Sequence, residues 1–198
     1  MRLTKYPTPD AYRAAQVEGN TRKRDRVWAL EGNIRWLAEH VVPRYAHFGM
    51  CHGTRTGAEV QWFEKYTGAW VGGTDIGPSA ETAYHTIQHD FHEPLPEWVG
   101  KADFVYSNSH DHARDPERAL RTWLAQLRPG GVLILEHTDY HEQLTDYNCW
   151  AISADDLVDF LSEKMGCRDI SHHVLPECHP YLRYCVAVVV RVPGESKP

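Results

Sequence analysis

The side chains best suited to bind a ligand fall between His47 and Asp75. Within this stretch one short apolar run ends in a turn containing Gly49 and Gly53, and a second run ends at the carboxylate of Asp75. Glycine lets the backbone approach a ligand because it has no Cβ, and a carboxylate about 20 residues beyond such a turn can accept hydrogen bonds from two ribose hydroxyls. The spacing predicts a strand, turn, helix and second strand that bind a nucleoside, with Gly57 allowing the helix to pack closely on the sheet.

A second group of polar residues follows the apolar run 102–107. It comprises Ser107, Asn108, Ser109, His110, Asp111 and His112. Ligands of open α/β sheets bind beyond the carboxyl ends of the strands, where this group is expected. A histidine with an ordinary pKa of about 6.5 can remove a proton at neutral pH. We therefore predict that His110 or His112 is a general base oriented by Asp111 or Asp115. The alternative is that both are ordinary loop histidines.

The sequence contains 13 histidines, several of them close together. His89, His92, His137 and His141, together with Asp139, could gather around a divalent cation. These residues are scattered along the chain, however, and no His-x-x-x-His pair with a firm third ligand is present. We therefore predict that the protein binds no metal.

Composition excludes several classes of protein. A chain of 198 residues fits one domain, 1–198, and the formal charge of −6 argues against broad binding to nucleic acid or to membranes. No apolar run approaches 18 residues, and we expect a soluble protein. The 5 cysteines form no C-x-x-C pair and are odd in number, which favours a reducing compartment, the cytoplasm.

Hydrophobic periodicity and turn signals predict strands that alternate with helices, followed by a hairpin. Residues 1–43 are predicted to form a helical lid over a core domain, 44–198, and a frayed polar tail is expected at 194–198. The strands are expected at 44–48, 69–75, 86–89, 102–107, 132–135, 170–175 and 184–192, and the main core helices at 54–66, from Pro116, and from Ser153. The last two strands are joined too closely for a crossover helix and should pair antiparallel. The pattern predicts a Rossmann-like doubly wound α/β sheet, mostly parallel, with an antiparallel C-terminal hairpin.

From about Arg44 to Val192, this pattern resembles the class I S-adenosylmethionine-dependent methyltransferases. The glycine-rich first motif of that family matches His47, Gly49, Cys51 and Gly53, with two of its three glycines retained and its acid replaced. The ribose-binding acid matches Asp75, and the acid that meets the adenine matches Asp90, beside Phe91. The run 127–133, Leu-Arg-Pro-Gly-Gly-Val-Leu, resembles the turn before the fifth strand of the family.

The resemblance implies that S-adenosylmethionine is the cofactor and that the protein transfers a methyl group. The residues implied to bind the cofactor are Gly49, Cys51, Gly53, Asp75, Ile76, Asp90, Phe91, Ser107 and Asn108. The residues after the fourth strand lack the Asn/Asp-Pro-Pro-aromatic signature of enzymes that methylate nucleic acid bases. The lack of this signature, together with the negative charge, favours a small-molecule acceptor. Tyr140 and Trp150 would either shape an aromatic pocket for that acceptor or pack in the core.

Several alternatives stay open at this point. The same fold could use S-adenosylmethionine for a cyclisation or an elimination, or the chain could be a catalytically silent cofactor-binding subunit. The basic run 21–26 could hold an anionic group of the substrate or form a solvated helix face. The oligomeric state is open as well, with a homodimer as one option.

Overall fold

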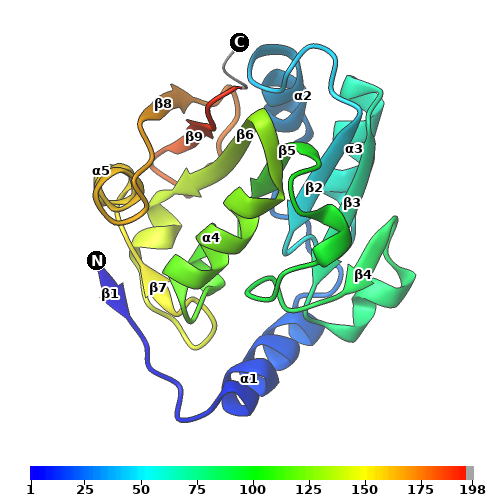
Figure 1. Ribbon diagram of the computed structural model, residues 1–198. Coiled ribbons are helices and arrows are strands. Elements are labelled where there is room, and N and C mark those ends of the chain that lie inside the picture. The colour runs from blue at the N-terminus through cyan, green and yellow to red at the C-terminus, as the bar shows by residue number, and fades with distance from the viewer. Residues whose placement is uncertain (195–198) are drawn as a thin grey trace.

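A computed structural model of the protein describes residues 1–194, arranged as a mixed α/β structure (Figure 1). The predicted polar tail therefore lies, apart from Gly194, outside the described residues. The strands are β1 (Arg2–Leu3), β2 (Phe48–His52), β3 (Trp70–Asp75), β4 (Thr86–Gln88), β5 (Ala102–Ser107), β6 (Leu127–Thr138), β7 (Trp150–Ala151), β8 (Asp169–Val174) and β9 (Cys185–Arg191). The helices are α1 (Pro9–Arg22), α2 (Glu31–His40), α3 (Ala58–Thr67), α4 (Pro116–Gln126) and α5 (Ala154–Asp159), the last continued by a π-helical segment, Phe160–Lys164.

The main sheet has seven strands in the order β4-β3-β2-β5-β6-β9-β8. The strands from β4 to β6 pair in parallel, and β9 is antiparallel to both β6 and β8. Helices cover both faces: α2 and α3 pack on one side and α4 and α5 on the other. The predicted doubly wound sheet with a C-terminal antiparallel hairpin is confirmed.

Local sequence signals explain the elements that were predicted best. The side chain of Asp115 accepts a hydrogen bond from the backbone N–H of Arg118 (3.1 Å), and Pro116 occupies the first helical position of α4. The apolar residues 132–135 of β6 are fully buried because the sheet is covered on both faces. The strand itself is longer than predicted and runs from Leu127 to Thr138.

The first strand of the sheet was predicted four residues too early, at 44–48. Strand β2 runs from Phe48 to His52, where Gly49 to Cys51 pair with β3 on one side and β5 on the other. Gly49 is thus a strand residue, and the turn begins at Gly53, whose φ is +76°. Because the turn extends to Gly57, helix α3 begins at Ala58 rather than at Thr54.

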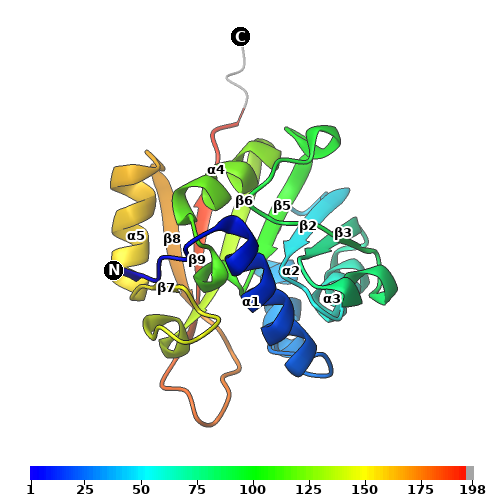
Figure 2. The same ribbon diagram turned by 90° about the horizontal axis from the view of Figure 1, so that it is seen from below.

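The N-terminal segment has two structural roles. Helix α2 belongs to the core, because Ile34 and Leu37 are fully buried against Val60 and Phe63 of α3. Helix α1 instead crosses the end of the sheet, as Figure 2 shows from below. Ahead of it, β1 pairs antiparallel with β7. Of the predicted lid 1–43, it is α1 that lies over the sheet end. None of the helices described within residues 1–194 is long and apolar enough to cross a membrane.

Candidate functional site

Two adjoining cavities lie at the carboxyl ends of β2, β3 and β5. The smaller has a volume of about 40 Å³ and the larger about 610 Å³. Both are lined by Lys23, Gly53, Arg55, Ser109 and His112. The sheet order creates this location, because the chain turns in opposite directions from β2 toward β3 and toward β5, which leaves a crevice beyond the strand ends.

Asp75 lies at the end of β3 and lines the smaller cavity, beside Ile76. It is 4% exposed and accepts hydrogen bonds from the backbone N–H groups of Arg55 (2.8 Å) and Gly77 (2.7 Å). A third bond comes from Asn20 of α1, whose Nδ2 donates to Asp75 Oδ1 at 2.6 Å. Burial raises the pKa of Asp75 above its ordinary value, and these donors oppose that rise. Helix α1 therefore contacts the predicted ribose-binding carboxylate directly.

Asp90 and Phe91 follow β4 and line the same cavity. The backbone N–H of His92 and its ring Nδ1–H both donate to Asp90 Oδ1, at 3.1 and 2.6 Å. Burial favours a higher pKa for Asp90, but the bonds from His92 outweigh it and lower the pKa below its ordinary value. Phe91 packs edge-to-face on Trp123, with ring centroids 5.2 Å apart. The two residues predicted to meet an adenine ring thus lie together, and His92 keeps the acid ionised.

Three of the residues predicted to bind the cofactor line neither cavity. Gly49 leaves room for the ring of Phe104, which a Cβ would strike. Cys51 is fully buried in the core. Ser107 braces the turn after β5: its Oγ donates to His52 O (2.9 Å) and accepts from Ser109 N (3.0 Å). Gly53, by contrast, lines both cavities, and Asn108 lines the larger one.

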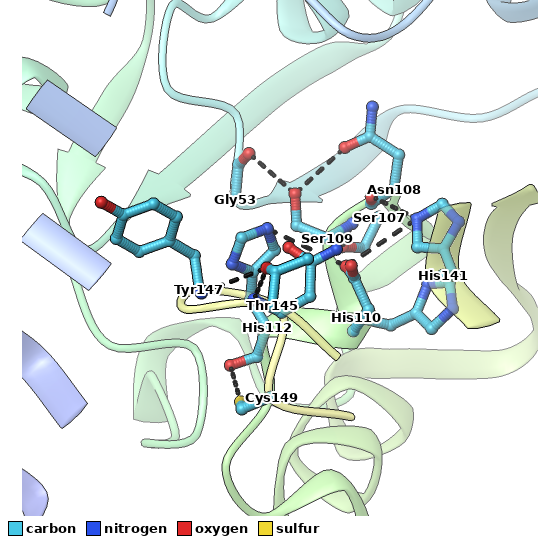
Figure 3. A network of polar contacts seen from close by, with 12 residues as sticks. Gly53, Ser107, Asn108, Ser109, His110, His112, His141, Thr145, Tyr147 and Cys149 are labelled. Atoms are coloured by element: carbon cyan, nitrogen blue, oxygen red, sulfur yellow. Dashed lines mark hydrogen bonds and ion pairs between the residues drawn. The ribbon is translucent and has the colours of Figure 1, made fainter. Parts of the chain in front are cut away.

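The turn after β5 brings the remaining polar residues to the cavities. Figure 3 shows Ser109 between Gly53 and Asn108, to which its Oγ is linked at 3.3 and 3.2 Å. A Cβ on Gly53 would lie 2.6 Å from Ser109 Cβ, so glycine is required there for the close approach of the two loops as well as for the positive φ. This contact fixes Asn108 and Ser109 at the cavity wall.

His110, predicted as a base, lies behind the cavities. It is 1% exposed, and its ring stacks on His141 with centroids 4.7 Å apart. Its Nε2 lies 3.1 Å from Nδ1 of His137. Burial and the neighbouring imidazoles lower the pKa of His110 well below its ordinary value. His110 is therefore a neutral, buried ring away from the cavity surface.

His112 lines both cavities, and its hydrogen bonds define its tautomer. The amide of Gln16 donates through Nε2 to Tyr147 O (2.8 Å), so its Oε1 faces Nδ1 of His112 at 2.8 Å and accepts a hydrogen bond from the Nδ1–H. In the neutral ring Nε2 consequently carries the lone pair. Asp111 Oδ1 lies 4.0 Å from Nε2 and favours the protonated ring, whereas burial lowers the pKa of His112. His112 can accept a proton, and Asp111 can stabilise the resulting charge.

His141 also lines the larger cavity, but both of its ring nitrogens are engaged. Its Nδ1 accepts from the backbone N–H of Thr138 (2.9 Å), and its Nε2 donates to Asn108 O (3.1 Å). Among the histidines from 108 to 141, His112 is therefore the one that lines a cavity and keeps the lone pair of a ring nitrogen free.

Within residues 1–194, no three His, Cys, Asp or Glu side chains are arranged to hold a metal ion.

The sequence reasoning missed much of the wall of the larger cavity. Glu59 and Asn148 are buried polar residues that line it. Its aromatic residues are Trp28, Tyr140, His179 and Tyr181, of which only Tyr140 was singled out. A signal in the sequence was Glu59, a charged residue next to the apolar Val60 within the helix predicted at 54–66; in the structure Glu59 lies in the first turn of α3. From the basic run, Lys23 and Arg26 line this cavity.

Comparison with known proteins agrees with this geometry. Residues 50–135 match a family model described as a methyltransferase domain. No curated protein was found to match the chain.

Several solved structures share the fold. A 1,6-didemethyltoxoflavin-N1-methyltransferase of Burkholderia thailandensis, with bound 1,6-didemethyltoxoflavin and S-adenosylhomocysteine, matches at 15% identity and a TM-score of 0.72, covering 96% of this chain and 94% of the other. The [4+2]-cyclase SpnF matches at 14% identity and a TM-score of 0.70, covering 98% and 99%. A complex of the Haloferax volcanii Trm112 methyltransferase activator with a methyltransferase matches at 17% identity and a TM-score of 0.69, covering 92% and 97%.

The sequence match covers the strands and turns that surround the cavities, and the structural matches extend over nearly the whole chain. Residues 50–135 thus match a methyltransferase domain, and the chain as a whole has the Rossmann-like fold of S-adenosylmethionine-dependent methyltransferases, which supports S-adenosylmethionine as the cofactor.

Proposed function

We propose that the protein transfers the methyl group of S-adenosylmethionine to a small-molecule acceptor held in the larger cavity, with His112 as the general base. The observation that carries this proposal is the position of His112, which lines both cavities and presents an unshared Nε2 lone pair. A base between a cofactor site and a substrate site is what the transfer to a protonated nucleophile requires.

The residues around the smaller cavity fit the cofactor. Asp75 offers a buried carboxylate at the end of β3 for the ribose, and Asp90 and Phe91 offer an acid and a ring for the adenine. At about 40 Å³ the cavity has room for only a few water molecules, so Asn20 and the rest of α1 must move to admit a nucleoside. When bound, the cofactor supplies a methyl carbon whose bond to the sulfonium sulfur breaks, with the bonding electrons passing to sulfur, as the acceptor's lone pair bonds to that carbon.

The work of this chain is to align the acceptor and to take its proton. Nε2 of His112 would receive the proton that the nucleophilic atom loses, and Asp111 would stabilise the imidazolium. His110 and His141 would hold the turn that carries Asp111 and His112 through their ring stacking. Lys23 and Arg26, which also line the larger cavity, would attract an anionic group on the acceptor.

Calorimetric titration with S-adenosylhomocysteine tests the cofactor site. We expect micromolar binding that falls at least about tenfold in Asp75→Asn, because a neutral amide replaces the acceptor of the ribose hydroxyls. Asp103→Asn is the matched control: Asp103 is a buried aspartate that accepts bonds from His47 N and Phe48 N and lines neither cavity. Failure of the folded wild-type protein to bind, or an equal loss in both variants, would contradict the proposal.

Product analysis separates methyl transfer from the other uses of the fold. Transfer predicts S-adenosylhomocysteine and methylated product in equal amounts. A cyclisation or an elimination at the sulfonium would consume S-adenosylmethionine and release methylthioadenosine without a methylated product, and a silent subunit would leave S-adenosylmethionine unchanged. We further propose that the protein works in the cytoplasm, a reducing compartment, because its cysteines are free thiols. These are Cys51, Cys149, Cys167, Cys178 and Cys185.

A further inference from the structure

The floor of the larger cavity contains buried polar atoms without partners. Glu59 is 4% exposed, and its Oε2 has no hydrogen-bond partner within residues 1–194. Asn108 is 7% exposed and its Nδ2 is likewise unpartnered, while its Oδ1 faces Ser109 Oγ at 3.2 Å. Both residues line the cavity. The cavity lining therefore offers an acceptor at Glu59 and a donor at Asn108, adjacent side chains whose proximity lowers the pKa of Glu59 without a well-formed hydrogen bond at Oε2 or Nδ2 within the described chain.

The same cavity is also lined by aromatic residues. Trp28 packs against Tyr140 and His179, with ring centroids 5.3 and 5.2 Å apart. His179 stacks on Tyr181, at 5.3 Å with the planes inclined by 14°. These rings come from the linker between α1 and α2, from the turn after β6, and from the loop between β8 and β9. Tyr181 is 67% exposed, although an aromatic side chain gains by being covered.

We propose that the acceptor is a planar heteroaromatic ring with an N–H donor next to a carbonyl group, the edge of a cyclic amide. The N–H would donate to Glu59, the carbonyl would accept from Asn108, and the face of the ring would lie against the aromatic residues around Trp28. This inference rests on the proposed function, since it names the substrate class of the same site.

The polar pair and the aromatic residues together favour this edge over simpler groups. A buried donor or acceptor left unpaired costs free energy, so a ligand that pairs both at once is favoured over one that pairs neither. An aliphatic hydroxyl group could also donate to Glu59 and accept from Asn108, but an aliphatic chain would not stack on the rings around Trp28, whereas a planar heteroaromatic ring would. Asn148 adds a second amide with the same property: it is 1% exposed, both of its side-chain polar atoms are unpartnered within residues 1–194, and it lines the cavity.

The test uses the full chain saturated with S-adenosylhomocysteine at pH 8, where the carboxyl group of Glu59, whose pKa burial raises to about 7, is ionised and accepts hydrogen bonds. Lumazine, xanthine and uracil are the probes, and 1,3-dimethyllumazine, caffeine and 1,3-dimethyluracil, which lack the N–H donors, are their controls. We expect at least one probe to bind with its affinity at least about tenfold above that of its methylated control, because a site built around a hydrogen bond rejects an analogue that lacks it. Substitution Trp28→Ala should weaken the probe and its control equally.

Glu59→Leu removes the acceptor and should erase the preference for the N–H ring, while Glu59→Gln, which keeps a carbonyl oxygen, should retain most of it. Affinity for S-adenosylhomocysteine serves as the measure of an intact fold in both variants. Binding of S-adenosylhomocysteine without binding of any probe, or a preference unchanged in Glu59→Leu, would overturn this inference and leave the proposed function standing. Failure of S-adenosylhomocysteine itself to bind would overturn the proposed function.

Discussion

The buried carboxyl group of Glu59 makes stability depend on pH in a way that can be measured without any ligand. Burial raises the pKa of Glu59 from 4.5 to about 7; its own backbone N–H, Arg55 and Asn108 oppose this rise, and the nearby Glu136 strengthens it. Below pH 4.5 the group is protonated in both the folded and the unfolded chain and has no differential effect. Above pH 7 it is ionised in both, and the folded state must hold a buried charge.

The magnitude follows from these two values. At about 1.4 kcal/mol per pH unit, the interval between 4.5 and about 7 corresponds to about 3 kcal/mol of stability, lost as the pH rises. The side chain is 4% exposed, so solvent screens little of this effect. Glu59→Gln, which is never charged, should lack that loss.

Urea unfolding of the wild-type protein and of Glu59→Gln, followed at several pH values from 4.5 to 8, measures the effect. The difference between their free energies of unfolding should move by about 3 kcal/mol in favour of the variant over this range. The comparison cancels all groups common to both proteins. Glu136→Gln is the control for the coupling, and it should lower the pKa of Glu59 by removing a neighbouring charge. Two curves that stay parallel would show that Glu59 ionises as freely in the folded protein as in the unfolded chain.

Three further predictions concern the site. His112→Ala should lower kcat about 100-fold to 10,000-fold with unchanged affinity for S-adenosylhomocysteine, as expected for a lost general base; unchanged turnover would exclude that role. Because burial lowers the pKa of His112 below 6.5, kcat/KM should be level above pH 6.5 and fall only at lower pH, where the ring becomes protonated; an acid limb above pH 7 would contradict this. Gly19→Ala places a Cβ 2.6 Å from the Tyr147 ring and should weaken S-adenosylhomocysteine binding by displacing α1. The control is Gly68→Ala, at a residue with φ of +71° and open space around it, which should cost only about 1 kcal/mol of stability. Equal affinities for S-adenosylhomocysteine in the two variants would refute the role of α1.

The parts of the structure that could be predicted are those encoded by short-range signals. Asp115 and Pro116 identify the start of α4 because capping is local. The position of Asp75 follows from its distance to the glycine turn, since both flank a single strand–helix–strand unit. Gly49 misled the prediction because a glycine in a strand and a glycine in a turn look alike in sequence. Only the ring of Phe104, 55 positions away, distinguishes them.

The choice between His110 and His112 depends on long-range contacts. Both follow β5, but Gln16 on α1 engages His112 while His137 and His141 enclose His110. The aromatic wall is similarly assembled from three separate segments, which no periodicity reveals. Resemblance to a family can indicate a cofactor, but the acceptor site is built by these distant parts of the chain.

Helix α1 is held at both of its ends. Strand β1 ties the preceding residues to β7, and α2 anchors the following residues in the core. Between these anchors Asn20 donates to the carboxylate that the ribose would need. A doubly tethered segment cannot swing away as a hinged flap and has to slide or loosen along its length. Cofactor association should therefore be limited by the frequency of that internal motion, giving a rate that reaches a plateau as the cofactor concentration rises.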